Sequence, residues 1–281
     1  MKKFIRHSIN NIFLYGSVTV VCLFLVSIIF QIFSRGLPVI SWEFIADFPK
    51  DGLTKGGIFP AIAGTILLTF ITTLLAVPFG IACAIYLSEY AHDNWLTRLI
   101  RAAIRNLAGI PSIIYGLFGL ALFVQALQMG TSLLASGFTL GLLSLPYIIT
   151  TSEESLRRVP TLVREGSLAL GATQLECIRD VVLPAALPGI LTGVILSLSR
   201  AAGETAPILF TGAVFYINSL PGQPTQEFMA LPYHLYMLST QHQSIELVRP
   251  LAYGTATVLI VLVFLLNIIA FYIRFKKRNY E

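Results

Sequence analysis

Long uncharged, apolar stretches divide the chain into segments. Five of these stretches contain no Asp, Glu, Lys or Arg, and they cover residues 7–34, 56–88, 106–152, 181–199 and 250–273. A helix needs about 20 apolar residues to cross the hydrocarbon core of a membrane. The stretch 106–152 is long enough for two crossings, and its polar interruption at Gln125–Ser132 marks the turn between them.

The hydrophobic pattern therefore predicts six transmembrane helices. It indicates an all-α integral membrane fold of mostly antiparallel helices with no sheet. The predicted spans cover residues 12–33, 60–87, 107–127, 131–151, 186–209 and 250–273. The fifth span is unusual because it contains Arg200 and Glu204 and begins near two prolines, Pro184 and Pro188.

Composition excludes a water-soluble protein. Of the 281 residues, 56% are hydrophobic and 12% are charged, and the mean hydropathy is +0.78. An average soluble domain carries about 25% charged residues, and its surface alone needs about that share. The chain has too few charges to build such a surface.

The positions of the basic residues predict the orientation in the membrane. Lys and Arg accumulate in cytoplasmic loops. Only four of them fall in one set of loops, namely Arg35, Lys50, Lys55 and Arg249. The opposite set holds Lys2, Lys3, Arg6, Arg98, Arg101, Arg105, Arg157, Arg158, Arg164, Arg179, Arg274, Lys276, Lys277 and Arg278. We therefore expect a multi-pass membrane protein with both termini in the cytoplasm.

Two features at the ends of the spans have a simple interpretation. The basic start of the chain, residues 1–6, is similar to the first part of a secretory signal, but the apolar segment after it is too long for one. We expect it to remain as the first span. The formal net charge of +5 is explained by topology and contact with anionic membrane lipid, and we expect no nucleic-acid partner.

The sequence offers few groups for catalysis or metal binding. Cys22 and Cys83 lie within spans and Cys177 lies in a cytoplasmic loop, so no disulfide is predicted. A zinc pair of His234 and His242 is the weaker alternative to two unrelated histidines. The phosphate-binding loop GxxxxGK[ST] does not occur. We therefore expect no cofactor, no metal and no enzymatic activity of the chain's own.

The cytoplasmic segment 152–183 predicts a compact helical projection. A capping box of Thr150 or Thr151 with Glu153 or Glu154 opens a first short helix. Pro160 starts a second helix over 161–170, and Gly171 ends it.

A capping box of Thr173 with Glu176 opens a third helix, which ends before Leu183–Pro184. Apolar contacts within the projection are expected from Leu162, Leu168, Leu175, Ile178 and Val182. The segment is either a docking projection for a partner or a loop that folds back.

Part of this segment resembles the EAA loop of ABC importer permeases. That family pattern reads E-A-A-x3-G-x9-I-x-L-P. Glu165, Gly171, Leu183 and Pro184 match it with both spacings. The departures are Gly166 and Ser167 in place of two alanines and Val181 in place of isoleucine. The resemblance implies that this loop couples the permease to an ATPase.

Three further segments are similar to phosphate-uptake permeases of the PstA type. They cover residues 57–65, 106–120 and 199–207. The resemblance implies the type I ABC importer permease fold, with a first helix and outer loop over 1–57 and a permease domain over 58–275. It also implies a location in the bacterial cytoplasmic (inner) membrane and inorganic phosphate as the transported ion. The implied partners are a second, homologous permease subunit, two copies of a cytoplasmic ATPase and an extracytoplasmic phosphate-binding protein.

Arg200 and Glu204 form the candidate substrate pathway. They lie one helical turn apart in an apolar span, and an ionisable residue at membrane depth indicates a functional site. The guanidinium of arginine is always charged and presents a planar fork of donors to phosphate oxygens. Glu204 is expected to pair with it when no anion is bound. The alternative is a purely structural pair that holds the bundle together.

Other interpretations remain open at the sequence level. Two interpretations exist for Pro111 and the glycines of the third span, Gly109, Gly116 and Gly119. They line a gate or, the favoured interpretation, let helices pack closely. The outer loop 211–249 lies along the membrane interface or dips back into it, where it could meet the binding protein. A secondary transporter working alone is the main alternative function, and sulfate or molybdate are alternative substrates that side-chain chemistry does not distinguish from phosphate.

Overall fold

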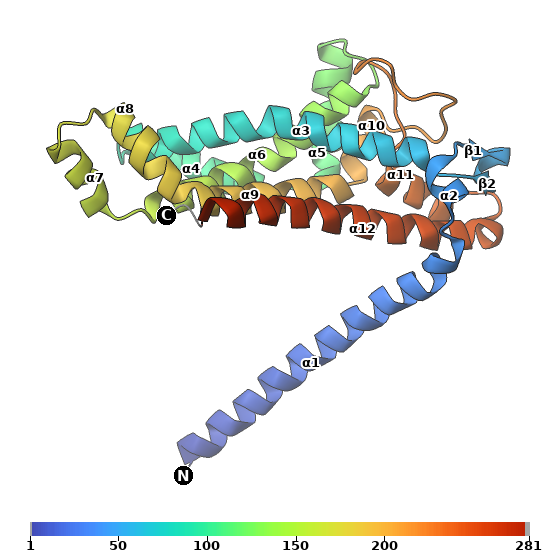
Figure 1. Cartoon of the computed structure of the whole chain (residues 1–281), viewed down its shortest axis with the longest axis horizontal. Helices are drawn as coiled ribbons and strands as arrows, with labels where there is room; N and C mark the ends of the chain where they lie inside the picture. Colours follow the sequence, from blue (N-terminus) through green and yellow to red (C-terminus); the bar gives the residue numbers. More distant parts are fainter. Residues whose placement is uncertain (1, 279–281) are drawn as a thin grey trace.

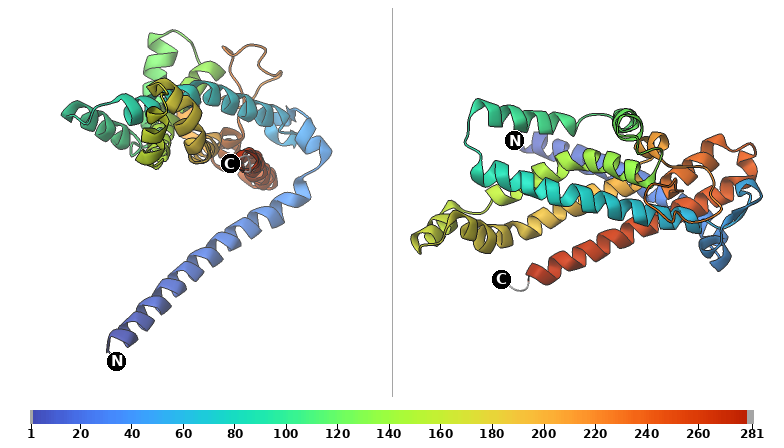
Figure 2. Two further views of the ribbon diagram at one scale, coloured as in Figure 1. Left: turned by 60° about the vertical axis from the view of Figure 1, so that its left-hand side comes forward. Right: turned by 90° about the horizontal axis from the view of Figure 1, so that it is seen from above.

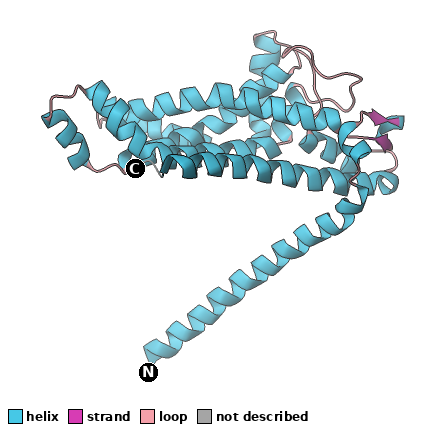
Figure 3. Ribbon diagram, viewed as in Figure 1, coloured by secondary structure: helices cyan, strands magenta, loops and turns pink. Residues whose placement is uncertain are grey.

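The computed structural model describes residues 2–278, and helices dominate this part of the chain (Figures 1 and 3). The elements in chain order are α1 (Lys2–Gly36), η1 (Leu37–Val39), α2 (Trp42–Ala46), β1 (Pro49–Lys50), η2 (Asp51–Leu53), β2 (Lys55–Gly56), α3 (Phe59–Ile85), η3 (Tyr86–Tyr90), α4 (Trp95–Leu107), α5 (Ser112–Gly119), η4 (Leu120–Ala126), α6 (Leu133–Arg157), α7 (Thr161–Ala169), α8 (Gln174–Cys177), η5 (Ile178–Val182), α9 (Leu183–Gly203), α10 (Ala206–Thr211), α11 (Leu231–Tyr236), η6 (Met237–Gln241) and α12 (Ile245–Arg278).

Five of the predicted spans are long apolar helices within the described residues. They cover Leu14–Val39, Phe59–Tyr90, Leu133–Arg157, Gln174–Gly203 and Ile245–Ile268. The sixth is a pair of helices, α4 and α5–η4, bent by 101°. The all-α membrane fold is therefore confirmed, although the prediction of no sheet is wrong. A two-stranded antiparallel ribbon pairs β1 with β2 at the end of the molecule opposite α7 (Figure 3).

The third predicted span, 107–127, differs from the observed helix. The chain bends after α4 and resumes a helix only at Ser112, after Pro111. A proline disfavours helical geometry in the residue before it, which explains why no straight helix passes through Ile110. Hydropathy alone missed α4, because its arginines lower the local average.

The fifth predicted span, 186–209, is wrong at both ends. The helix begins at Gln174 and passes through Leu183–Pro184 without a break. In a regular α-helix the ring of Pro184 would clash with the carbonyl of Asp180, four residues earlier. Asp180 lies in the π-type turn η5, whose wider geometry avoids this clash. At the other end α9 stops at Gly203, because a continued helix would press the ring of Pro207 against the Gly203 carbonyl.

The predicted first helix of the segment 152–183 does not exist as a separate element. Helix α6 continues to Arg157. The hydroxyl of Thr150 donates to the carbonyl of Pro146 at 2.7 Å, and that of Thr151 donates to Tyr147 at 2.8 Å. Both threonines therefore bond backwards within one helix and cap nothing.

Helices α3, α6 and α9 pack along one another and form the centre of the bundle (Figure 2). One hydrophobic cluster of the described residues joins them, with Ile148 of α6 and Ile190 of α9 fully buried. Gly116 and Gly119 permit close approach of α5 to α10 and α6, since an added Cβ would overlap Pro207 or Thr139. This supports the packing interpretation of these two glycines.

The predicted outer loop 211–249 folds back into the bundle. Phe228, Met229 and Leu231 are fully buried. The backbone N–H of Leu231 donates to the hydroxyl of Thr65 in α3 at 2.8 Å. The loop therefore forms part of the core at the end opposite α7.

Helix α1 leans away from this bundle (Figure 1). Its apolar window is not buried by the rest of the chain, and its last turn packs at Gly36 against Tyr253 and Thr257 of α12. The N-terminal end of α1 and the C-terminal end of α12 both point toward the α7 end of the molecule (Figure 2).

At Gly64, α3 packs closely against the segment 228–231, which folds back into the bundle. An added Cβ would overlap the backbone carbonyl of Met229. We expect Gly64→Ala to lower the free energy of unfolding by about 1–3 kcal/mol, the usual cost of an overpacked core. The midpoint of thermal unfolding in detergent measures this loss. Gly222→Ala adds the same methyl group where there is room, and an equal loss in both variants would contradict the prediction.

Candidate substrate pathway and coupling helix

Arg200 and Glu204 meet at the end of α9, where the helix stops. Arg200 lies in its last turn, and Glu204 is the first extended residue after it. The Nε of Arg200 donates to Oε1 of Glu204 at 3.2 Å. The predicted pair is therefore present in the structure.

Tyr147 of α6 is a third member of this group, and the sequence analysis missed it. Its ring lies under the guanidinium of Arg200, with 4.7 Å between Cζ and the ring centroid. Nη1 of Arg200 donates to the Tyr147 hydroxyl. This hydroxyl donates in turn to the carbonyl of Ala108 at 2.7 Å. A tyrosine inside a span needs such a partner for its hydroxyl, which is the only signal the sequence carried.

The bend between α4 and α5 supplies free carbonyls to this group. The last carbonyls of a helix have no partner within it. Those of Leu107 and Ala108 accept from the hydroxyls of Tyr115 and Tyr147, at 2.9 and 2.7 Å. The bend that hydropathy did not predict thus holds the hydroxyls of both tyrosines, and Tyr147 in turn contacts Arg200.

The Arg200 group is open on one side. In this chain the side chain of Arg200 is 42% exposed and that of Glu204 is 16% exposed. An anion approaching from the open side would meet a guanidinium held by one carboxylate and one phenol. Such an arrangement can bind an anion if the carboxylate yields its place.

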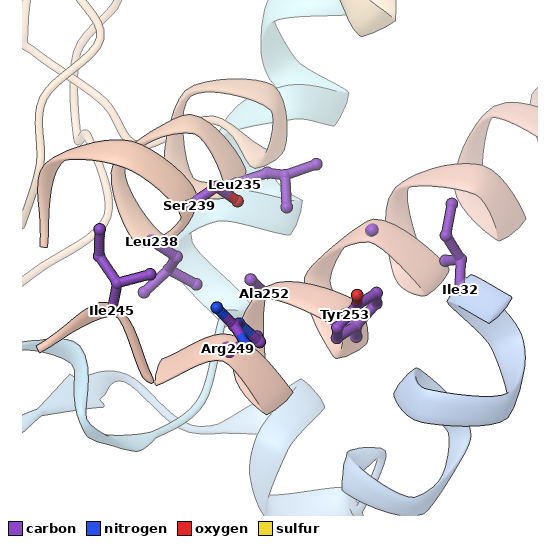
Figure 4. A pocket seen from close by; sticks show the side chains of 9 residues that line it. Ile32, Leu235, Leu238, Ser239, Ile245, Arg249, Ala252 and Tyr253 are labelled. Atoms are coloured by element: carbon purple, nitrogen blue, oxygen red, sulfur yellow. The ribbon is translucent and has the colours of Figure 1, made fainter. Parts of the chain in front are cut away.

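A concavity is lined by residues of α1, α11, η6 and α12 (Figure 4). It encloses about 300 Å³ and is mainly apolar, with Arg249, Ser239 and Tyr253 as its polar members. Arg249 is already paired with Glu246 at 2.7 Å. Neither Arg200 nor Glu204 lines this concavity.

The predicted second helix of the segment 152–183 is α7, and its ends are as expected. Pro160 precedes its first residue, Thr161. Gly171 follows it with φ +91°. The N–H of Gly171 donates to Leu168 and that of Ala172 donates to Ser167, at 3.0 and 3.3 Å. These two bonds form the Schellman motif, which needs a left-handed residue at this position.

The capping box that opens α8 is also confirmed. The Thr173 hydroxyl accepts from the N–H of Glu176, and the Glu176 carboxylate accepts from the N–H of Thr173 at 2.8 Å. Both reciprocal hydrogen bonds of the capping box are therefore present.

The apolar residues of the projection do not all pack as predicted. Ile178 and Val182 are buried, but Leu162, Leu168 and Leu175 are exposed. Leu170, at the tip, is 92% exposed. Glu165 and Gly166 are exposed as well, Leu183 is partly buried and Pro184 is exposed. The projection thus presents an apolar surface that this chain does not cover.

The bundle and the projecting α7 define a multi-span membrane permease. Residues 76–279 match the sequence model of the binding-protein-dependent transport system inner membrane component family. This match covers most of the chain, so the protein belongs to that family of ABC importer permeases. It is a transport subunit and an inner membrane component.

Relatives of similar length carry more specific names. The chain is 35% identical over 264 residues to a probable phosphate transport system permease protein PstA of Methanocaldococcus jannaschii, with 92% of each chain covered. It is 33% identical over 280 residues to phosphate transport system permease protein PstA 1 of Mycobacterium tuberculosis, covering 98% of this chain and 90% of the relative. A PstA of Pasteurella multocida is 34% identical over 244 residues, with 86% and 85% covered.

Solved structures agree on the fold. A bacterial alginate ABC transporter, crystallised with a pentasaccharide-bound periplasmic protein, matches with a TM-score of 0.68 at 14% identity, over 96% of this chain and 94% of the other. The MetNI methionine ABC transporter in an inward-facing form matches with a TM-score of 0.59 at 21% identity, over 79% and 94%. These likenesses confirm the type I importer permease fold.

Proposed function

We propose that this chain is the permease subunit through which an ATP-driven importer moves inorganic phosphate into the cell. The observation that carries the proposal is its similarity, over nearly its whole length, to permeases named for phosphate transport. The Arg200 group supports it, because a guanidinium fork on an open face suits a tetrahedral oxyanion. In this mechanism Glu204 holds Arg200 when no anion is present and acts as a latch that phosphate displaces.

The open face of the Arg200 group is where a second, homologous permease subunit would complete the pathway. The uncovered apolar surface of α1 is consistent with such a partner. We assign the α7 end of the molecule to the cytoplasm, since the basic residues of the loops gather there. Both termini are then cytoplasmic, and an extracytoplasmic phosphate-binding protein would dock at the end that carries β1 and β2.

Helix α7 would enter a groove on one of two ATPase subunits, which hydrolyse the ATP. Its exposed apolar side chains and the exposed carboxylate of Glu165 are the groups that such a groove would contact. A secondary transporter working alone would have no use for this uncovered surface. The projection therefore favours the ATP-driven importer over that alternative.

The choice of anion is tested by the ATPase activity of the assembled transporter. We expect phosphate, delivered by the binding protein to proteoliposomes, to stimulate ATP hydrolysis and to accumulate inside. Sulfate and molybdate, offered with the same binding protein and with their own, are the comparison anions. If sulfate or molybdate stimulates ATP hydrolysis and accumulates while phosphate does neither, that anion and not phosphate is the substrate. The assignment to ATP-driven importers would not be affected.

A further inference from the structure

An ion pair joins α7 to the C-terminal end of the long helix formed by α3 and η3. The guanidinium of Arg164, in α7, contacts both carboxylate oxygens of Glu89, with Nη2–Oε1 at 3.0 Å and Nε–Oε2 at 3.2 Å. Glu89 lies in η3, which continues α3 without a break. The side chains are only 19% and 9% exposed. Two residues 75 positions apart are thus held by a forked contact.

The same guanidinium also holds the end of α6. Its Nη2 donates to the carbonyl of Leu156 at 2.7 Å, and its Nη1 donates to the carbonyl of Val159. From the other side, the side chain of Gln174 donates to the backbone carbonyl of Glu89 at 3.0 Å. Arg164 therefore ties α7 to the ends of both α3 and α6.

Helix α7 has little else to hold it. None of its residues is buried, and its main packing partners are α8 and η5. Apolar burial is what normally fixes the place of a helix on a protein. Since α7 lacks it, the direction in which α7 points depends on the side-chain contacts of Arg164, on the turn at Gly171, and on a weak hydrogen bond from the Cys177 thiol to the Arg164 carbonyl at 3.9 Å.

Nearby ion pairs at this end of the bundle do not share this arrangement. Arg101 and Glu153, also mostly buried, are 2.7 Å apart and join α4 to α6. Arg158 and Glu154 lie within one helix at 3.9 Å, with side chains 82% and 62% exposed. Among the described residues, Glu89–Arg164 is the mostly buried ion pair that includes a residue of α7.

We propose that Glu89 and Arg164 are the positioning residues that transmit movement of α7 to α3 and α6. This inference rests on the proposed function, in which an ATPase moves α7. A force on α7 reaches α6 and α9 through the chain itself, at residues 158–160 and at the turn Gly171–Thr173. The contacts of Arg164 carry it to α3 as well and add a direct side-chain link to the end of α6. Because α6 carries Tyr147, the link connects the ATPase contact with the Arg200 group.

The test removes both charges of the link at once. The double variant Glu89→Gln with Arg164→Gln leaves no unpaired ion, which avoids the damage caused by a lone buried charge. We expect the assembled transporter to keep hydrolysing ATP while anion uptake per ATP falls about tenfold, the size of known coupling effects. Arg164→Lys retains a charge without the fork and should lie between wild type and the double variant.

The matched control removes an exposed pair of the same residue types. Glu154→Gln with Arg158→Gln should leave uptake per ATP at the wild-type value. Amide hydrogen exchange of the assembled transporter provides a readout that needs no substrate. We expect α7 to exchange about tenfold faster in the Glu89–Arg164 double variant while the buried amides of α3 and α6 keep their protection.

Three results for the Glu89–Arg164 double variant would overturn the proposal. The first two are uptake per ATP at the wild-type value and unchanged hydrogen exchange of α7. The third is a loss of protection throughout α3 and α6, because the pair would then stabilise the bundle rather than position α7. Loss of the ATPase subunits with α3 and α6 still protected would instead support it, because α7 would be misdirected. If phosphate is the wrong substrate, the wild type itself fails to take up phosphate, and the exchange experiment still decides the role of the link.

Discussion

Uptake of phosphate is expected to fall to background in Arg200→Gln. The substitution removes the guanidinium fork at the open face of the group and leaves Glu204 and Tyr147 without the cation that both contact. Arg200→Lys keeps a positive charge without the planar fork, so we expect partial activity. The measurement is uptake of labelled phosphate into proteoliposomes that contain the complete transporter.

A second variant separates a transport role from a structural one. If the pair only supports the bundle, Arg200→Gln lowers the free energy of unfolding, because it leaves the Glu204 carboxylate without a partner. Breaking a fully buried pair costs about 3–5 kcal/mol, and we expect a smaller loss here because Arg200 is partly exposed. Arg200→Gln with Glu204→Gln removes both charges. We expect this double variant to assemble normally and still not transport. Restored assembly together with restored uptake would rule out a transport role for Arg200.

Tyr147→Phe tests the contribution of the Tyr147 hydroxyl separately from that of its ring. It keeps the aromatic face and removes the hydroxyl that accepts from Arg200 and donates to Ala108. We expect assembly to be retained and uptake to fall less than in Arg200→Gln, because the positive charge stays in place.

Coupling is expected to fail in Gly171→Val. Gly171 has φ +91°, a conformation that a β-branched residue adopts only under strain of about 1–3 kcal/mol. An added Cβ would meet no other atom within 4 Å, so backbone strain is the cause. Relief of the strain would break the Schellman motif and redirect α7. We expect weaker retention of the ATPase subunits and loss of ATP-driven uptake, with normal insertion of the permease in the membrane.

Gly171→Asn is the matched control, because asparagine tolerates left-handed geometry better than valine. It should retain more uptake and more bound ATPase than Gly171→Val. Equal, normal transport by both variants would mean that the end of α7 does not set its direction.

The local features of the candidate site could be predicted because their causes lie within a few residues. The Schellman turn at Gly171 and the capping box of Thr173 and Glu176 each involve neighbours along the chain, and both are present. Arg200 and Glu204 lie one helical turn apart, so their pairing also follows from the sequence. Thr150 and Thr151 show the limit of such signals, because the same residue types bond backwards in a helix that continues.

The sequence by itself determined that the chain crosses the membrane several times and that it carries a projecting helix, since about 20 apolar residues indicate a span and local caps specify a short helix. The pattern around Glu165 and Gly171 indicated the class of the protein, but the bounds of the third and fifth spans did not follow from the sequence. Only the tertiary structure decided how these parts meet. Tyr147 is 53 residues from Arg200, and Glu89 is 75 residues from Arg164. Such contacts depend on where a helix bends and which face it turns to its neighbour. A hydrophobic pattern records the length of a span, but within a membrane all its faces are apolar, so the pattern carries little information about rotation.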